Sequence, residues 1–403
     1  MKEDTQLLFT KLLDINNNNT RSFKPIVLSK EGTQLIKHLF NKLHATNNDW
    51  ESHKPSIQIE TLSELPKSTD FAYIPLKIKT EIENDCIHLY SCSFTFKQRI
   101  FTVYLCLKSA QPKYIIGLIR RIYLWLSIAS EHVQKNCSNT VNIYLYLIGK
   151  KKEIPFKSAE AIDLIHVNTA FTTGCQLHTN VHIFREEEWF RALIHESFHN
   201  LGFDFLQLET KLQNEAEKKI RNIFPVKMRE IRFNETYCEM WAEVLNIIFI
   251  VYLSDIPSLS LKNPTLKMMN TFKQMLLYEG MFSLWQCVKV LNHNNLVYSQ
   301  LYNESLASTY REKTQGFSYY ILKSIYMVHV SQFLHHCATQ ASTSPFKFGL
   351  SSDSIQSYTG IIEKNHNSYN MREGIQIFEK EIVLAKGFWK NTLRMSLFEG
   401  TVV

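Results

Sequence analysis

The sequence predicts an α+β fold in which strands occupy the first half of the chain and helices the second. Two patterns support this prediction. Between residues 57 and 184, several short segments alternate apolar and polar side chains, as half-buried strands do. After residue 206, apolar side chains recur at helical spacing over long stretches. With 403 residues, 45% of them hydrophobic and 12% aromatic, the chain can bury a large core.

The first half is predicted to hold two helices followed by a sheet. Residues 1–13 and 32–44 have the pattern of amphipathic helices, and the asparagine run at 16–19 separates them. Strands are expected at residues 57–62, 71–79, 87–96, 100–107 and 141–147, and a long apolar helix at 114–133. The third and fourth strands form a hairpin whose turn is Lys97-Gln98-Arg99.

The second half is predicted to be mostly helical, without internal repeats. Helices are expected at residues 206–223, 234–253, 264–292 and 316–340, with one more near 371–388. We divide the chain into an N-terminal helical extension (1–55), an α/β part (56–205), a helical part (206–343) and a C-terminal segment (344–403). The pattern assigns no chemistry to the last of these.

One motif in the α/β part carries chemistry, His195-Glu196-x-x-His199. Trp189, Leu193, Ile194 and Phe198 form an apolar stripe at helical spacing, acidic residues 186–188 precede it, and Gly202 marks its end. Residues i and i+4 share one helical face, so the two imidazoles can hold one zinc ion. The intervening Glu can then act as general base. A random chain of this composition contains the motif about 0.03 times.

Three templates compete for the third ligand. A metzincin places a His where Phe205 stands, and Asp204 is one residue out of register. A peptide-deformylase arrangement takes an upstream Cys, and Cys175 is the candidate, but the other deformylase elements are absent. The third template takes a Glu from a later helix, for which the chain offers Glu235, Glu239 and Glu243.

These three glutamates lie at i, i+4 and i+8, on one face of the predicted helix 234–253. The residues that follow are almost all apolar, so this helix is expected to be buried. Buried carboxylates are costly unless they are paired or bind a metal. The cost favours a functional site over an acidic surface stripe.

Over residues 160–255 the chain resembles the gluzincins, the zinc peptidase group that includes thermolysin and anthrax lethal factor. Glu239-Met-Trp-Ala-Glu243 is similar to their second motif, which implies that Glu239 is the third zinc ligand and that Glu243 supports His195. Asn234-Glu235 with Glu239 is similar to the thermolysin form, in which Glu235 would be the ligand. We favour Glu239, because the small Ala242 lets the two helices approach closely.

The resemblance implies a zincin-like fold: a mixed-sheet upper subdomain ending in the active-site helix, and a mostly helical lower subdomain. It implies hydrolysis of peptide bonds, with Glu196 as general base and Tyr319, or its neighbour Tyr320, stabilising the oxyanion. A peptide or protein substrate would add to an edge strand at residues 181–184 or 167–172. The alternative is a non-catalytic module of the same fold that binds zinc or a partner, as a virion protein could.

The other histidines and charged residues singled out in the sequence are expected to be ordinary polar or surface residues. His178 and His182 are expected at ordinary polar positions, although either could face the cleft. The net charge of +7 is modest, and Lys150-Lys151-Lys152 is expected to be a solvated loop, so nucleic acid is not an expected partner.

Cysteine usage and hydropathy bear on localisation. Eight cysteines without CxxC pairs favour free thiols in a reducing compartment, with Cys238 a small core residue. No signal peptide is recognised, and no apolar run reaches the roughly 20 residues that span a bilayer. We therefore expect a cytoplasmic or virion-associated protein. Abundant Asn, Lys and Ile suggest an AT-rich genome, such as that of a large DNA virus or a parasite.

Overall fold

The computed structural model describes residues 2–400 except 53, 62–68, 110, 134–135, 159, 256–265 and 341–343. It is 59% helical and 12% strand with one mixed sheet, which confirms the predicted combination of helices and sheet. The chain divides into two compact units. Unit 1 comprises Met1–Lys37, Lys152–Val167 and Phe205–Glu399, and unit 2 comprises His38–Lys151, Asn168–Asp204 and Gly400–Val403.

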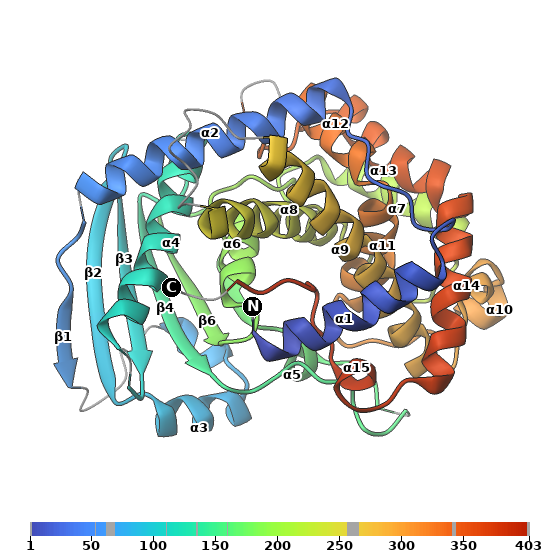
Figure 1. The fold of residues 1–403 in the computed structure, drawn as a ribbon, viewed down its shortest axis with the longest axis horizontal. Helices are drawn as coiled ribbons and strands as arrows, with labels where there is room; N and C mark the ends of the chain where they lie inside the picture. The colour runs from blue at the N-terminus through green and yellow to red at the C-terminus, as the bar shows by residue number, and fades with distance from the viewer. Residues whose placement is uncertain are drawn as a thin grey trace. The chain divides into compact units, whose positions relative to one another are not determined.

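Unit 2 is built on the six-stranded sheet, with strand order β1-β2-β3-β4-β6-β5; Figure 1 shows β1 to β4 and β6 side by side. Its strands are β1 Gln58–Thr61, β2 His88–Phe96, β3 Arg99–Leu107, β4 Thr140–Ile148, β5 Ala170–Thr172 and β6 His178–Arg185. β3, β4 and β6 are parallel, and the other pairs are antiparallel. β5 is therefore an edge strand, as one of the two predicted alternatives has it, and β6 is interior.

The two faces of the sheet are covered by different helices. α4 (Pro112–Ser130) and α6 (Trp189–Asn200) pack on one face, which carries the buried row Leu105, Leu145 and Ile183 in register. α3 (Leu76–Asp85) packs on the other, against a cluster that includes Tyr146 and Phe184. Alternate residues of each strand thus enter two separate apolar layers, which fixes the register.

The hairpin of β2 and β3 is confirmed together with its turn. Phe96 pairs with Arg99, and the two residues between them, Lys97 and Gln98, have φ angles of 43° and 69°. Two consecutive residues with positive φ are the mark of the tight turns whose twist matches that of paired strands.

The strand predicted at residues 71–79 is wrong, because this segment is helical. It forms a 3₁₀ turn, η1 (Thr69–Tyr73), followed by α3, and Pro75 stands at the N-cap of α3. Ile74, Ile78 and Ile82 recur every fourth residue and are all at most 2% exposed. The period of four, rather than the local alternation, decided the structure.

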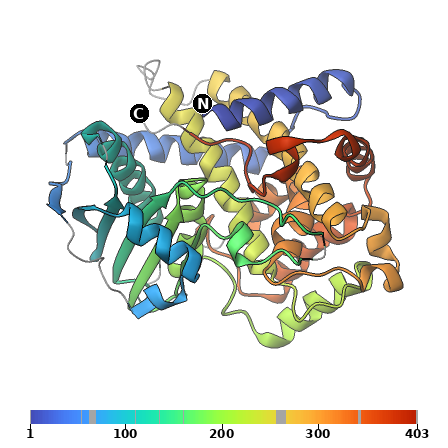
Figure 2. The same cartoon turned by 90° about the horizontal axis from the view of Figure 1, so that it is seen from below.

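Unit 1 is helical, as predicted for the second half of the chain (Figures 1 and 2). Its helices are α1 Glu3–Asn18, α5 Leu164–Val167, α7 Thr210–Ile223, α8 Phe233–Asp255, α9 Leu266–His293, η3 Tyr298–Tyr302, α10 Glu304–Ala307, η4 Phe317–Leu322, α11 Lys323–Val328, α12 Val330–Gln340, α13 Ser352–Asn365, α14 Tyr369–Leu384 and α15 Gly387–Asn391. α2 (Lys30–Ser52) begins in unit 1 and continues into unit 2.

Several predicted helix bounds differ from those observed. The helix predicted at 316–340 is three segments, η4, α11 and α12, and η4 is a π-helix. The C-terminal part holds α13, α14 and α15 instead of a single helix. Residues 264–265 of another predicted helix lie outside the described part of the chain.

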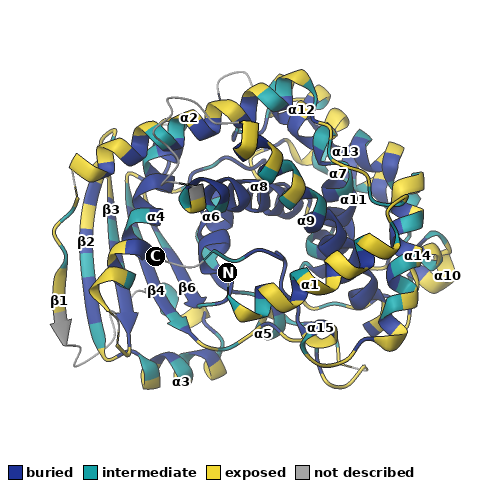
Figure 3. Ribbon diagram, viewed as in Figure 1, coloured by how far each residue is buried: buried dark blue, intermediate teal, exposed yellow. Residues whose placement is uncertain are grey.

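α8 is the central helix of unit 1, and Figure 3 shows it almost entirely in the colour of buried residues. Among the described residues, only its span Phe233–Ser254 is long and apolar enough to cross a membrane, and 89% of that window is buried. A buried apolar helix of this kind is typical of the core of a soluble protein.

The C-terminal segment, to which the sequence assigned no chemistry, is anchored inside unit 1 by buried polar side chains. Lys289 Nζ and Tyr320 OH donate to the carbonyl oxygens of Thr392 and Leu393. Glu279, on α9, accepts hydrogen bonds from the backbone N–H groups of Leu397 and Phe398 at 2.9 and 3.0 Å. Extended backbone is tolerated in this interior because side chains satisfy its polar groups.

Candidate metal centre

The helix with the His-Glu-x-x-His motif, α6, is held in place by packing within unit 2. It lies on β5 and β6 and beside α4. Leu193, Ile194 and Phe198 have no exposed surface. Trp125 of α4 stacks on Phe198 with parallel rings 6.2 Å apart, and its indole N–H donates to Ser197 Oγ at 3.0 Å. The apolar stripe read from the sequence therefore fixes the rotation of α6 about its axis.

The N-terminal end of α6 is closed by Glu188, the last of the three predicted acidic residues. Glu188 is the N-cap and has a left-handed conformation with φ of 60°. Its carboxylate lies 3.3 Å from Arg191 Nε, and both side chains are at most 4% exposed. The pair places negative charge beside the positive end of the helix dipole.

The C-terminal end of α6 is a Schellman motif, which confirms Gly202 as the predicted stop. Phe203 N–H donates to the carbonyl of Phe198 at 2.9 Å, and Gly202 N–H donates to that of His199 at 3.2 Å. Gly202 has a φ of 69°, a conformation for which glycine is suited. The rings of Phe198 and Phe203 pack edge to face at 5.3 Å, the apolar contact that accompanies this motif.

The two motif histidines converge on one point. Their Nε2 atoms are 3.2 Å apart, His195 is buried, and His199 is partly exposed. Two nitrogens bound to one tetrahedral zinc ion at roughly 2.0–2.1 Å are separated by about 3.3 Å. The spacing thus fits a pair of ligands for a single metal ion.

Asp204 orients the second histidine, a role that the sequence did not reveal. Its Oδ2 accepts a hydrogen bond from His199 Nδ1 at 2.6 Å, and its side chain is only 4% exposed. Because Nδ1 carries the proton, Nε2 of His199 presents its lone pair, the form of imidazole that binds metals. The Schellman turn makes this contact possible by reversing the chain between residues 200 and 204.

Glu196 lies beside His195 on the same helix and is 9% exposed. Its carboxylate follows His195 directly in sequence, precedes His199 by three residues and does not belong to the apolar face of α6. Glu196 thus lies on a helix rather than in a loop.

In unit 1 the three glutamates of α8 have different environments, and one lysine distinguishes them. Lys323 Nζ, on α11, lies 2.9 Å from Glu243 Oε2 and 3.8 Å from Glu239 Oε2. All three side chains are at most 3% exposed. The same ammonium donates to the carbonyl of Met395 at 2.6 Å. Lys323 is therefore a counter-charge that Glu243 and, at longer range, Glu239 share within unit 1.

Glu235, two turns earlier than Glu243, has a different partner. Its Oε2 accepts a hydrogen bond from Tyr319 OH at 3.1 Å. Tyr319 lies in η4, the π-helix, a local irregularity that recurs at functional sites. Its side chain is partly exposed, whereas Glu235 is 8% exposed and more accessible than the other two glutamates. Tyr319 and Glu235 thus form a pair near solvent.

The remaining predicted candidates take structural roles. Tyr320 is buried and donates to the carbonyl of Leu393 at 2.7 Å. His182 is fully buried between the rings of Tyr144 and Phe171, and burial lowers its pKa to about 4. His178 is exposed and bonded to Thr140, and Cys238 is a buried free thiol, as expected.

Two expectations about cysteines and lysines are wrong. Cys137 and Cys175 form a disulfide, so not all eight cysteines are free thiols, and Cys175 cannot be a metal ligand. The lysine cluster is not a uniformly solvated loop. Lys152 is 1% exposed and Lys150 pairs with Glu81, because the strand end at this point turns into the interior.

Asp204 and Lys323 are the residues that the sequence did not single out. Asp204 follows the helix stop by two residues, a position from which an acidic side chain can reach back to the last turn. From the sequence, Asp204 was considered only as a direct ligand of the metal. Lys323 is one of many lysines, and no local pattern marks it as buried.

Comparison with family models, curated proteins and solved structures finds no match for this chain.

Proposed function

We propose that this protein is a zinc-dependent metallopeptidase that hydrolyses peptide bonds. The observation that supports this most directly is the convergence of His195 and His199 Nε2 atoms at 3.2 Å, with Asp204 fixing the proton on the far nitrogen of His199. Zinc, when bound, supplies a Lewis acid that polarises the substrate carbonyl and lowers the pKa of water at the site. A site that bound zinc only for structure would not need the general base Glu196.

We propose Glu235 as the third ligand, in place of Glu239, which the sequence favoured. A ligand carboxylate must keep an oxygen available. Lys323 is already the shared counter-charge of Glu239 and Glu243 inside unit 1, and withdrawing either carboxylate from that ammonium would break a buried ion pair. Glu235 instead accepts a hydrogen bond from the phenol of Tyr319 at 3.1 Å, and at 8% it is the most exposed of the three glutamates. This assignment corresponds to the thermolysin form of the second motif.

The chain's own groups then divide the reaction between them. Glu196 accepts the proton of the attacking water and delivers it to the leaving amine. Tyr319 OH is the donor for the oxyanion that develops on the substrate carbonyl. The edge strand β5, which packs against α6, offers its outer backbone groups to an extended peptide. Together they predict an enzyme that binds its substrate in β conformation.

The test combines metal content with proteolysis in four proteins: wild type, Glu196→Gln, Glu235→Ala and Glu239→Ala. We expect wild type to bind one zinc ion and to cleave peptides from a mixed-sequence library. Glu196→Gln should retain the zinc and lose cleavage by at least about a thousandfold, because only the proton transfer is removed. Glu235→Ala should lose zinc, and Glu239→Ala should keep it.

The other outcomes are equally informative. Zinc loss in Glu239→Ala with zinc retained in Glu235→Ala would restore the assignment made from the sequence. A wild-type protein that holds zinc yet cleaves nothing in the library would identify a non-catalytic zinc-binding module. A wild-type protein that binds no zinc would refute the proposal as a whole.

A further inference from the structure

We propose that the Cys137–Cys175 disulfide is a positioning element of the metal centre: it holds the C-terminal turn of α6 so that Asp204 meets His199, and its reduction weakens metal binding. This inference rests on the proposed zinc site. It assigns a role in that site to a covalent bond between two loops that carry no ligand themselves.

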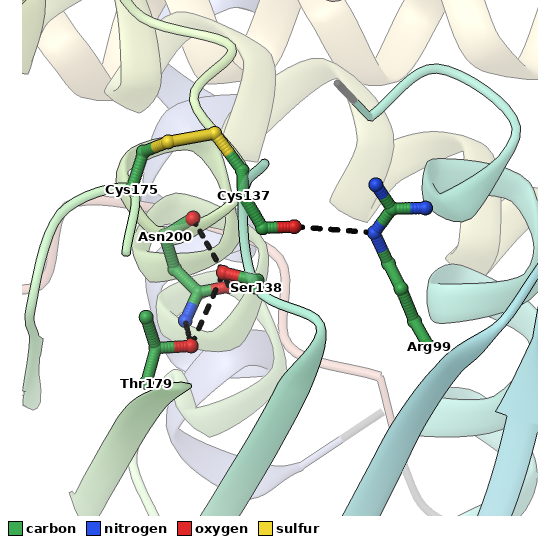
Figure 4. The surroundings of a disulfide bond; sticks show 6 residues. All are labelled: Arg99, Cys137, Ser138, Cys175, Thr179 and Asn200. Atoms are coloured by element: carbon green, nitrogen blue, oxygen red, sulfur yellow. Dashed lines mark hydrogen bonds between the residues drawn. A yellow bond between two sulfur atoms is a disulfide. The ribbon is translucent and has the colours of Figure 1, made fainter. Parts of the chain in front are cut away.

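The disulfide joins the segments that lead into two central strands of unit 2. Cys137 precedes β4 and Cys175 precedes β6, and their Cα atoms are 4.9 Å apart. Figure 4 shows the bond lying across the end of α6, above Asn200. Cys137 is buried, and Cys175 is partly exposed beside Gly174, where an added Cβ would meet open space. A reductant can therefore reach the bond from the side of Cys175.

The disulfide contacts the glycine that ends α6. A Cβ on Gly202 would stand 3.0 Å from Cys137 Sγ and 3.4 Å from Cys175 Cβ. The left-handed turn at Gly202 is thus pressed against both halves of the bridge. Because the Schellman hydrogen bonds pass through this residue, a displacement of either cysteine is transmitted to residues 202–204.

A polar network ties the same segment to the last residue of α6. Ser138 Oγ donates to the backbone carbonyl of Asn200 at 2.7 Å, and Asn200 Nδ2 donates to Thr179 Oγ1 at 2.6 Å (Figure 4). The carbonyl of Cys137 itself accepts from Arg99 Nε at 3.2 Å. Ser138 and Asn200 are at most 1% exposed, so water does not compete for these bonds.

The connection to the metal site is short. Asn200 is the last residue of α6, and Gly202 and Asp204 lie in the turn that follows it. Asp204 accepts the hydrogen bond that His199 donates, at 2.6 Å. If the disulfide is reduced, the segment 173–177 is no longer covalently linked to Cys137. The turn at residues 200–204 then loses part of the packing around it. A shift of well under 1 Å at Asp204 is enough to lengthen a charge-assisted hydrogen bond.

A purely loop-closing role predicts a different result. A bond that spans 38 residues stabilises mainly by restricting the unfolded chain. In that case its loss lowers the stability of unit 2 and leaves the folded zinc site unchanged. A positioning role changes zinc affinity in protein that remains folded, and this difference decides between the two.

The test uses a phosphine reductant, since dithiols bind zinc. The phosphine donates two electrons and is oxidised to its oxide with oxygen from water. The S–S bond breaks, and the two protons of that water end on the thiols of Cys137 and Cys175. Zinc affinity is measured by competition with a chromophoric chelator before and after reduction. We expect reduction, and the double substitution Cys137→Ala/Cys175→Ala, to weaken zinc binding about tenfold.

Controls separate this result from general damage. The double variant should be insensitive to the phosphine, and Cys337→Ala, at a buried free thiol of unit 1, should bind zinc as wild type does. Hydrogen exchange should speed up at residues 200–204 and not in α8. Re-oxidation of the wild type should restore its affinity.

The outcomes that contradict the proposal are also defined. Equal zinc affinity in oxidised and reduced protein overturns the inference and leaves the proposed function standing. Loss of the whole fold on reduction also overturns it, because the bond would then be a general stabiliser. Absence of zinc from the oxidised wild type counts against the proposed function itself.

Discussion

The two helices that carry the candidate ligands differ in the interactions that surround those ligands. α6 of unit 2 is held by apolar packing, one indole–hydroxyl hydrogen bond and a Schellman turn, and its two histidines already converge. α8 of unit 1 carries three carboxylates, of which two share the ammonium of Lys323. We propose the ligands on α6 from their geometry, whereas we propose the ligand on α8 from the contacts of its carboxylates.

This difference follows from the chemistry of the side chains. Neutral imidazoles can be buried at modest cost once one ring nitrogen has a hydrogen-bond partner, which Asp204 supplies to His199. Carboxylates in a dry interior need a counter-charge, which Lys323 supplies to Glu243 at 2.9 Å and to Glu239 at 3.8 Å. Glu235 accepts its hydrogen bond from Tyr319 instead, and for this reason we propose it, rather than Glu239, as the metal ligand.

The largest expected effect tests the charge compensation of the buried carboxylates on α8. Lys323→Met leaves Glu239 and Glu243 buried without their cation, and we expect unit 1 to lose about 3–5 kcal/mol of stability. Thermal or urea unfolding of the metal-free protein measures this. Adding Glu243→Gln to Lys323→Met removes the carboxylate closest to the lysine and should recover a large part of the loss. If Lys323→Met destabilised the protein no more than the substitution of an exposed residue does, Lys323 would not be the counter-charge of these carboxylates.

The next effect concerns the hydrogen bond between Asp204 and His199 of α6. Asp204→Asn keeps an acceptor oxygen for His199 Nδ1 and removes its charge, so the ring stays oriented while its basicity falls. We expect zinc affinity to drop about 10- to 100-fold, or roughly 1.4–2.7 kcal/mol, with little change in the stability of the metal-free protein. Chelator competition and thermal unfolding separate the two quantities. An unchanged affinity would mean that α6 alone presets the histidines.

The sequence was sufficient wherever one local rule decided the structure. The helix of the His-Glu-x-x-His motif with its glycine stop, the hairpin with its two-residue turn and the helical nature of unit 1 all follow from patterns within about ten residues. The strand predicted at residues 71–79 failed because alternation and a period of four overlap there, and Pro75 with the three isoleucines favoured the helix.

The site was less predictable than the fold, because its decisive contacts join residues that are distant in sequence. Lys323 is 80 residues from Glu243, and Cys137 is 38 residues from Cys175. Neither pairing leaves a trace in local composition. The preference for Glu239 over Glu235 rested on the small Ala242, which says nothing about a cation supplied by α11. Long-range charge compensation must be read from three dimensions.

A smaller effect distinguishes the two adjacent tyrosines of η4. Tyr320→Phe leaves the buried carbonyl of Leu393 without its donor, so we expect a loss of about 1–2 kcal/mol in stability and little direct effect on catalysis. Tyr319→Phe should leave stability nearly unchanged and reduce kcat for peptide hydrolysis by about 10- to 100-fold. Each variant is the control for the other in paired unfolding and kinetic measurements. A reversed pattern would move the oxyanion donor to Tyr320.

The last effect is a pH dependence at the N-terminal end of the same π-helix. Glu312 accepts hydrogen bonds from Phe317 N–H at 2.6 Å and from Tyr310 OH at 2.9 Å, and burial raises its pKa to about 7 against these donors. Between pH 4.5 and 7 the folded protein keeps a proton that the unfolded chain releases, so stability falls as the pH rises through this range.

Glu312→Gln removes this titration while keeping an acceptor oxygen for both donors. We expect the variant to match wild type near pH 4.5 and to be more stable by about 3 kcal/mol at pH 8, where wild type must bury the charge. Urea unfolding at four pH values between these limits checks the prediction. A difference that does not change with pH would show that Glu312 stays ionised in the folded state. Unit 1 would then bury one more carboxylate as an anion, held by neutral donors alone, and a cation such as Lys323 would not be required for burying a carboxylate there.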